Sequence, residues 1–265
     1  MGVVNVTPDS FSDGGRFDAV DAAVAHALAL VEQGAQFIDV GGESSRPGAE
    51  PVDAATECAR VVPVIAALRP RTDAVISIDT TKAEVAQAAL AAGAEVVNDI
   101  SAGRADPALM PLVAKAGAGF VLMHMRGTPQ TMQLGELRAA DRVGEMVDHL
   151  AARVEAAMAA GVAREALCLD PGIGFGKTVE QNCALIGQLP RLGALGRPVL
   201  VGASRKSFLG ALTDRPVEAR GPATFAACAA AIWQGAQVLR VHDVAEVRDV
   251  VRVVEAIRAT AQVGP

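Results

Sequence analysis

A chain of 265 residues, about half of them hydrophobic, is long enough to bury a large core, and its net charge of −6 argues against a nucleic-acid surface, which needs a clustered basic excess. Its four cysteines are scattered without a CxxC pair, which disfavours a zinc site or a disulfide framework. Because we find no signal peptide and no apolar span long enough to cross a bilayer, we expect a cytoplasmic protein that binds neither nucleic acid nor membranes.

Short apolar runs alternate with helix-patterned stretches from one end of the chain to the other. Runs of Val, Ile and Leu that become polar only near their C-terminal ends are typical of parallel strands covered on both faces. The expected strands are 2–6, 36–42, 74–80, 95–100, 119–125, 166–172, 198–204 and 237–243. Several of the intervening helical stretches end at a glycine, the usual residue just past a helix, as at Gly34, Gly93, Gly117 and Gly235.

Eight such strand–helix units predict an α/β fold, the (β/α)₈ TIM barrel, as a single domain over residues 1–265. An open doubly wound sheet is the alternative, but it usually has fewer strands. The loops 7–17 and 41–53 are long and rich in Gly, Ser, Pro and Asp. In a barrel both rise from the C-terminal rim, where the chemistry of this fold takes place.

The glycine-rich stretch 169–178, LDPGIGFGKT, raises the question of a nucleotide site. A P-loop, G-x-x-x-x-G-K-[ST], would need a glycine at position 171, where the chain has Pro171, a residue without an N–H. The dinucleotide pattern G-x-G-x-x-G fails as well, because the glycines alternate and Lys177 stands at the last position. We therefore interpret the stretch as a strand that ends at Asp170, followed by a flexible loop.

Polar side chains follow most of the expected strands. Taken alone, each has a structural explanation as a helix N-cap or a turn residue. By the same reasoning we expect His26 and His149 to be surface or packing residues, and Lys82 and Lys177 to be plain solvated side chains. The full set at the strand ends is harder to explain in this way: Asn5, Asp79, Asn98, His124, Asp170, the run Ser204–Ser207, Arg240 and His242.

The charges at these ends predict a pocket with two different sides. Cations gather after the last two strands, where barrels often hold a phosphate, and Arg240 and His242, two residues apart, share one face. The opposite side offers carboxylates and an amide but no cation, which suits a nitrogen-rich heterocycle. The expected ligand has a heterocyclic head and a phosphorylated or pyrophosphorylated tail.

Motifs spread over the chain make these residues recognisable. They are, in order, MGVVNVTPDSFSDGG, GGESSRPGA, SIDT, VNDIS, LMHMRGTPQTMQ, LDPGIGFGK, GASRKS and RVHDV. Together they resemble bacterial dihydropteroate synthase. The resemblance implies a (β/α)₈ barrel, usually a homodimer, that joins 6-hydroxymethyl-7,8-dihydropterin pyrophosphate to para-aminobenzoate. The products are 7,8-dihydropteroate, for folate synthesis, and pyrophosphate, and sulfonamides compete with the aminobenzoate.

The resemblance also implies roles for single residues. The implied pterin pocket consists of Asp79, Asn98, Asp170 and Lys206. Arg240 and His242 are the implied pyrophosphate binders, and with Lys206 and Asp79 they make up the implied catalytic set.

The aminobenzoate site and the metal complete this assignment. The aminobenzoate site is implied to involve Phe11, Ser45, Arg46, Pro47, Phe175 and Ser207. Asn5 is the residue implied to lie near Mg²⁺, the expected cofactor. Ser45 stands where relatives often have threonine, so the hydroxyl group is kept. The sequence begins almost at its first expected strand, so we expect the bottom of the barrel to be more open there.

Two other functions compete with this hypothesis. A methyltetrahydrofolate-dependent methyltransferase shares the pterin pocket but does not need the SFSDGG and ESSRP loops or the Arg240–His242 pair. A non-catalytic paralogue would bind pterin or a partner without turnover, although the motifs are intact here. For a dimer, the apolar late helices, 221–234 and 246–260, are the interface candidates.

Overall fold

The computed structural model describes residues 1–7, 16–46, 48–133 and 142–261. In these ranges the eight expected strands are all confirmed, each lying inside its predicted run and ending slightly earlier or starting slightly later. The strands are β1 (Gly2–Asn5), β2 (Phe37–Gly41), β3 (Val75–Asp79), β4 (Val96–Asp99), β5 (Gly119–Met123), β6 (Leu167–Asp170), β7 (Leu200–Val201) and β8 (Val238–Leu239).

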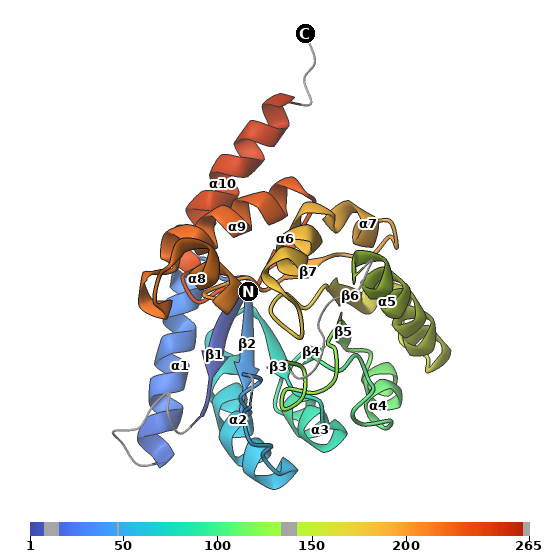
Figure 1. The fold of residues 1–265 in the computed structure, drawn as a ribbon. Coiled ribbons are helices and arrows are strands. Elements are labelled where there is room, and N and C mark those ends of the chain that lie inside the picture. The colour runs from blue at the N-terminus through green and yellow to red at the C-terminus, as the bar shows by residue number, and fades with distance from the viewer. Residues whose placement is uncertain (8–15, 47, 134–141, 262–265) are drawn as a thin grey trace.

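The strands close into a barrel. β1 to β6 are hydrogen-bonded in chain order as parallel neighbours, and β7 and β8 form a second parallel pair. Two bridges join the two sheets: Leu169 of β6 pairs with Val199 before β7, and Gly2 of β1 pairs with Val241 after β8. The strands gather at the centre of the molecule with the helices around them (Figure 1). This closed order is that of a (β/α)₈ barrel, whereas a doubly wound sheet would keep two open edges.

Helices surround the barrel in chain order. They are α1 (Arg16–Glu32), α2 (Ala54–Leu68), α3 (Ala83–Ala91), α4 (Leu109–Ala116), α5 (Arg142–Ala159), α6 (Val179–Gly187), α7 (Leu189–Gly193), α8 (Ser207–Thr213), α9 (Gly221–Trp233) and α10 (Val244–Ala261). Within the described residues, 3₁₀ helices lie at Arg69–Arg71, Arg164–Ala166 and Val217–Ala219. A helix follows each strand as expected, and β6 and β7 are each followed by two, α6 with α7 and α8 with α9. No helix in the described ranges combines the length and apolar character needed to span a membrane.

Alternation along the strands separates the helix-covered face from the barrel interior. Ile76 and Ile78 of β3 are fully buried in the large apolar core that packs the strands against the helices. Ser77 and Asp79 of the same strand therefore point the other way, into the barrel. The same alternation sends Asp39 of β2 inward, between the outward-facing Ile38 and Val40.

The register of the parallel strands assembles a polar row at the C-terminal rim. Asn5 of β1 pairs with Gly41 of β2, Gly41 pairs with Asp79 of β3, and Asp79 pairs with Asn98 of β4. Further round the barrel, Met123 of β5 pairs with Asp170 of β6. The backbone pairing alone thus places the strand-end residues at one end of the barrel.

Candidate active site

The guanidinium of Arg240 lies between two carboxylates at this rim. Its Nε donates to Asp39 Oδ2 at 2.6 Å and its Nη2 donates to Asp79 Oδ2 at 2.7 Å. Asn98 Nδ2 donates to the same Asp39 oxygen at 3.0 Å. Side chains from β2, β3, β4 and the end of β8 therefore form one hydrogen-bonded network.

This network corrects two features of the sequence prediction. Asp39, fully buried, is absent from the predicted set, although it is the residue that links Arg240 to Asn98. The expectation that the carboxylate side lacks a cation is wrong, because Arg240 reaches across to it. The sequence signal for Asp39 was an aspartate inside the apolar strand QFIDVGG, since a charge buried in a strand needs a partner.

Asp170, Lys206 and Phe175 lie next to the network. Asp170, almost fully buried, accepts a hydrogen bond from the Gly172 N–H at 2.6 Å. The Lys206 ammonium lies 4.2 Å from the centre of the Phe175 ring, within the range of a cation–π interaction. Against the effect of burial, which raises the pKa of Asp170, the nearby charges of Lys206, Lys177 and Arg240 favour its ionised form.

Burial shifts the ionisation of these groups towards their neutral forms. It raises the pKa of Asp79 to about 7, even with the Arg240 guanidinium beside it, and it raises the pKa of Asp170. Burial, reinforced by the charge of Arg240, lowers the pKa of Lys206 to about 8. Burial also opposes the charge of Arg240, but Asp39 and Asp79 hold the pKa of this guanidinium above its usual value. Strong pKa shifts of this kind cluster at functional sites.

His242 is held by a serine. Its ring Nδ1 lies 3.0 Å from Ser204 Oγ, and the same oxygen accepts a hydrogen bond from the backbone N–H of His242 at 3.3 Å. Burial, with the charges of Arg205 and Arg240, lowers the pKa of His242 to about 4, so the ring is neutral near pH 7. A neutral ring whose Nδ1 accepts from Ser204 keeps an Nε2–H donor for a ligand.

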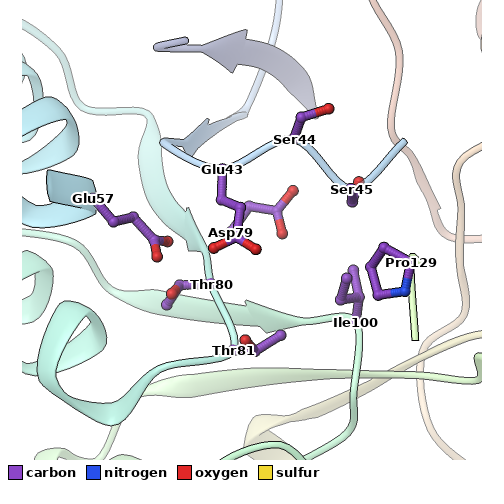
Figure 2. A pocket seen from close by; sticks show the side chains of 9 residues that line it. All are labelled: Glu43, Ser44, Ser45, Glu57, Asp79, Thr80, Thr81, Ile100 and Pro129. Atoms are coloured by element: carbon purple, nitrogen blue, oxygen red, sulfur yellow. The ribbon is translucent and has the colours of Figure 1, made fainter. Parts of the chain in front are cut away.

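A pocket of about 300 Å³, counting its solvent-open part, lies beside Asp79 (Figure 2). The loop after β2 supplies Glu43, Ser44 and Ser45, and the end of β3 and its loop supply Asp79, Thr80 and Thr81. Glu57, Ile100 and Pro129 complete its lining. The Gly48 N–H donates to the Pro129 carbonyl at 3.2 Å, which holds the loop after β2 against the loop after β5. Ser45 lines the pocket and belongs to the loop that this bond holds.

Of the other residues predicted for the aminobenzoate site, two are exposed and two lie outside the described residues. Arg46 and Ser207 are both exposed, Arg46 in the loop after β2 and Ser207 as the first residue of α8. Phe11 and Pro47 lie outside the described residues.

The expectation of solvated lysines is wrong at both positions. Lys82 pairs with Glu43 and, at 2.5 Å, with the fully buried Glu57, and these carboxylates raise the pKa of Lys82 against the effect of burial. Lys177 is only 5% exposed and donates to three backbone carbonyls. The two histidines follow the prediction, since His26 is exposed and His149 packs edge-on against His124 with ring centres 5.2 Å apart.

A separate apolar cluster forms part of the rim and was missed by the sequence analysis. Met123, Met125 and Met132 pack with Phe175, and Ile100 packs against them. Flexible thioethers next to an aromatic ring adapt well to a flat ligand. The signal was present in the motif LMHMRGTPQTMQ, where apolar residues continue beyond the strand.

The comparisons with known proteins agree with this geometry. A family model described as pterin binding enzyme matches residues 1–242, which is most of the chain. The barrel and its rim site thus define a pterin-binding enzyme.

Individual relatives narrow the family. Dihydropteroate synthase of Synechocystis is 49% identical over 97% of this chain and 89% of the relative. The Yersinia pestis enzyme, solved with a sulfonamide drug complex, is 43% identical with a TM-score of 0.92, covering 98% of this chain and 94% of that one. The Xanthomonas albilineans enzyme with 4-aminobenzoic acid is 46% identical, with a TM-score of 0.92 and coverages of 100% and 93%. The chain belongs to the dihydropteroate synthases, transferases of folate biosynthesis.

Neutralising Asp39 should destabilise the fold. In Asp39→Asn the half-buried Arg240 guanidinium keeps its charge but loses its fully buried anionic partner, which costs about 3 kcal/mol of unfolding free energy. Urea denaturation measures this loss. The control Asp249→Asn removes an exposed pair, 3.8 Å from Arg252, and should change the unfolding free energy by less than about 0.5 kcal/mol. Equal stability of the two variants would contradict the role given to Asp39.

Proposed function

We propose that the protein joins 6-hydroxymethyl-7,8-dihydropterin pyrophosphate to para-aminobenzoate, giving 7,8-dihydropteroate and pyrophosphate, with the residue roles below. The observation that carries this proposal is the Arg240 guanidinium fixed between Asp39 and Asp79, with Asp170 and Lys206 close by. This arrangement supports the proposal because hydrogen-bonding groups suited to a heterocycle lie next to cations suited to a diphosphate. The 4-aminobenzoic acid in the Xanthomonas albilineans enzyme supports the second substrate.

The pterin ring binds in a pocket of Asp79, Asn98, Asp170 and Lys206. Carboxylates accept paired N–H bonds from an amidine-like edge, and an amide can donate and accept on the same ring. The two carboxylates with raised pKa can each accept or donate, according to their protonation state. The methionine cluster with Phe175 offers an apolar surface beside these polar groups.

The diphosphate binds to Arg240 and His242. Arg240 supplies a planar fork of donors and His242 a neutral N–H donor, while the Lys206 ammonium of the pterin pocket adds a compact positive charge nearby. Arg240 can also stack on the pterin ring. Because strands and their ends carry these groups, the cations are fixed before the charge of the leaving diphosphate develops.

The aminobenzoate site lies towards the loops. Phe175 and Ser207 form one wall, and the loop after β2 brings Ser45, Arg46 and Pro47. Phe11, from the loop after β1, completes the proposed set.

The reaction is a dissociative displacement. The bond between the exocyclic methylene carbon and the bridging oxygen breaks, and its electron pair leaves with pyrophosphate. The electron-rich dihydropterin delocalises the positive charge, which the carboxylates of Asp79 and Asp170 stabilise. The neutral amine of aminobenzoate then forms the new C–N bond and gives its proton to water, so no strong general base is required.

Asn5 is the proposed contact for Mg²⁺. No group of three or more His, Cys, Asp or Glu suited to a metal occurs among the residues the structure describes, but Mg²⁺ commonly keeps several waters and takes ligands from substrate phosphates. A single amide oxygen in the same strand register as Gly41 and Asp79 fits that manner of binding. When bound, Mg²⁺ would neutralise negative charge on the diphosphate.

We also propose that residues 1–265 act as one cytoplasmic domain. One apolar core takes in residues from Val4 to Val254. The cysteines at 58, 168, 183 and 228 are free thiols, which suits a reducing compartment.

A homodimer through α9 and α10 is the proposed assembly. Trp233, Val253 and Ile257 are each about half exposed, with Val253 and Ile257 one helical turn apart. Arg258 Nη1 donates to the Ile232 carbonyl at 2.9 Å, which brings the end of α10 next to Trp233. The last turns of α10 extend away from the body of the molecule (Figure 1), where a second copy can cover them.

Pyrophosphate release tests the proposed reaction. Release should require both the pterin pyrophosphate and para-aminobenzoate, and should fall about 100-fold or more in Arg240→Ala because the leaving charge loses its main donor. A coupled phosphate assay measures it, with calorimetry to follow pterin binding. Binding of the pterin pyrophosphate without product would indicate a non-catalytic paralogue, and methyl transfer to a corrinoid would indicate the methyltransferase.

The pH dependence tests Lys206. Its ammonium is charged below a pKa of about 8 and neutral above it, so kcat/KM for the pterin pyrophosphate should fall between about pH 7 and 9. Lys206→Arg stays charged throughout and should lack this fall, whatever its absolute rate. The ionisation of the substrate itself is the same in assays of the wild type and of Lys206→Arg. If the pH profile of kcat/KM is unchanged in the variant, the fall above pH 7 belongs to a group other than Lys206.

Sedimentation velocity tests the dimer. The double variant Val253→Asp, Ile257→Asp should sediment as a monomer because carboxylates would be buried at the interface. Leu212→Asp, an equally exposed apolar position on α8, should leave the dimer intact. A dimer that survives the double change would place the interface elsewhere.

A further inference from the structure

Lys177 carries a buried ammonium that the proposed mechanism does not use. Its Nζ donates to the carbonyl oxygens of Gly172 at 2.7 Å, Phe175 at 3.0 Å and His124 at 3.2 Å. Three acceptors match the three N–H donors of an ammonium group. Burial lowers the pKa of Lys177 to about 7, while the nearby Asp170 favours the charged form.

The backbone at Lys177 is fixed from the helix side. Thr178 is the N-cap of α6 and forms a capping box with Gln181. Asn182, almost fully buried, donates to the Thr178 carbonyl at 2.8 Å and accepts from the Gly174 N–H at 2.6 Å. The Lys177 side chain therefore extends from a rigid helix start into the loop that follows β6.

The carbonyls that Lys177 binds belong to two loops in very close approach. A Cβ on Gly172, which has a φ of +67°, would lie 1.9 Å from the His124 carbonyl oxygen. Gly172 O also accepts the Phe175 N–H at 3.1 Å, so one tight turn presents both of its carbonyls to Lys177. The ammonium thus bonds the loop after β6 to the start of the loop after β5.

Phe175 is the residue whose position this arrangement controls. Its carbonyl is bound to Lys177, and its ring packs on Met123, Met125 and Met132 and lies under the Lys206 ammonium. Two other bonds hold its loop, from the Gly174 N–H to Asn182 and from the Phe175 N–H to Gly172, but the flanking Gly174 and Gly176, both with positive φ, have no side chains to anchor it. Without the ammonium, the His124 and Phe175 carbonyls would lose this buried donor and the Gly172 carbonyl would keep the Phe175 N–H, so the loop would turn towards water.

We propose that Lys177 is a positioning residue that holds the Phe175 ring in place as the aminobenzoate wall and so sets the affinity of the enzyme for para-aminobenzoate. This inference rests on the proposed role of Phe175 in that site. The hydrogen bonds of Lys177 go to backbone carbonyls and to none of the proposed pterin side chains, of which Asp170 lies near it, so the larger effect should fall on para-aminobenzoate.

Steady-state kinetics of the full chain with each substrate varied in turn test the proposal. Lys177→Met keeps the length of the side chain but removes all three donors, and should raise KM for para-aminobenzoate about tenfold or more, with less than about threefold change in KM for the pterin pyrophosphate. Lys177→Gln keeps two N–H donors and should give an intermediate KM. Lys115→Met makes the same chemical change at an exposed position of α4 and should behave as wild type.

A double-mutant cycle separates failure of this inference from failure of the proposed site. Phe175→Ala should raise KM for para-aminobenzoate, and adding Lys177→Met should then change it by less than about twofold, because both changes act through one ring. If Phe175→Ala leaves this KM unchanged, the assigned wall is wrong. If Phe175→Ala raises it but Lys177→Met and Lys177→Gln do not, or if they raise both KM values alike or abolish folding, Lys177 serves the fold alone and the inference is overturned.

Discussion

The site depends on a charge balance inside the barrel mouth, where Asp39 and Asp79 share the Arg240 guanidinium. Each of these charges would be costly to bury alone, and their mutual attraction offsets that cost only when the geometry is good. The barrel provides that geometry through backbone pairing, since the register of β2 with β3 and of β3 with β4 fixes where Asp39, Asp79 and Asn98 lie. The active site is thus also part of what specifies the fold at this rim.

The same balance prepares the chemistry. A guanidinium held by two carboxylates has a fixed position, so it would need little reorganisation to bind the proposed diphosphate. Asp79 and Asp170, whose pKa values burial raises, are poised to meet a ring that carries both donors and acceptors. In the proposed reaction the pterin cation would form next to the carboxylates of Asp79 and Asp170, while the departing pyrophosphate would be held by Arg240. Each of the two separating charges would then lie beside a group of opposite charge.

Sequence patterns predicted the strands and their polar ends because both follow from local rules, apolar runs and side-chain alternation. They missed Asp39, since its importance lies in a contact with Arg240, 201 residues away, that no local pattern encodes. They misjudged Lys177 for the same reason, as its acceptors are carbonyls, which every residue has. The predicted division of the pocket into an acidic and a basic side was wrong. The end of a strand fixes the backbone position of Arg240, but its long side chain reaches across the barrel mouth to the carboxylates.

Two kinds of support therefore serve the two proposed substrates. The proposed pterin and diphosphate groups Asp79, Asn98, Asp170 and Arg240 stand at or just after strand ends, whose positions are set by the barrel itself. Phe175 stands on a glycine-rich loop outside the strand pairing of the barrel. The buried Lys177 ammonium supplies hydrogen bonds to the carbonyls of this loop. The Lys177 ammonium, bonded to three carbonyls, restrains this loop as backbone hydrogen bonds restrain a strand in a sheet. The burial of its charge opposes this stabilisation. An aromatic wall can thereby be carried on a loop and still be held within reach of the strand-borne site.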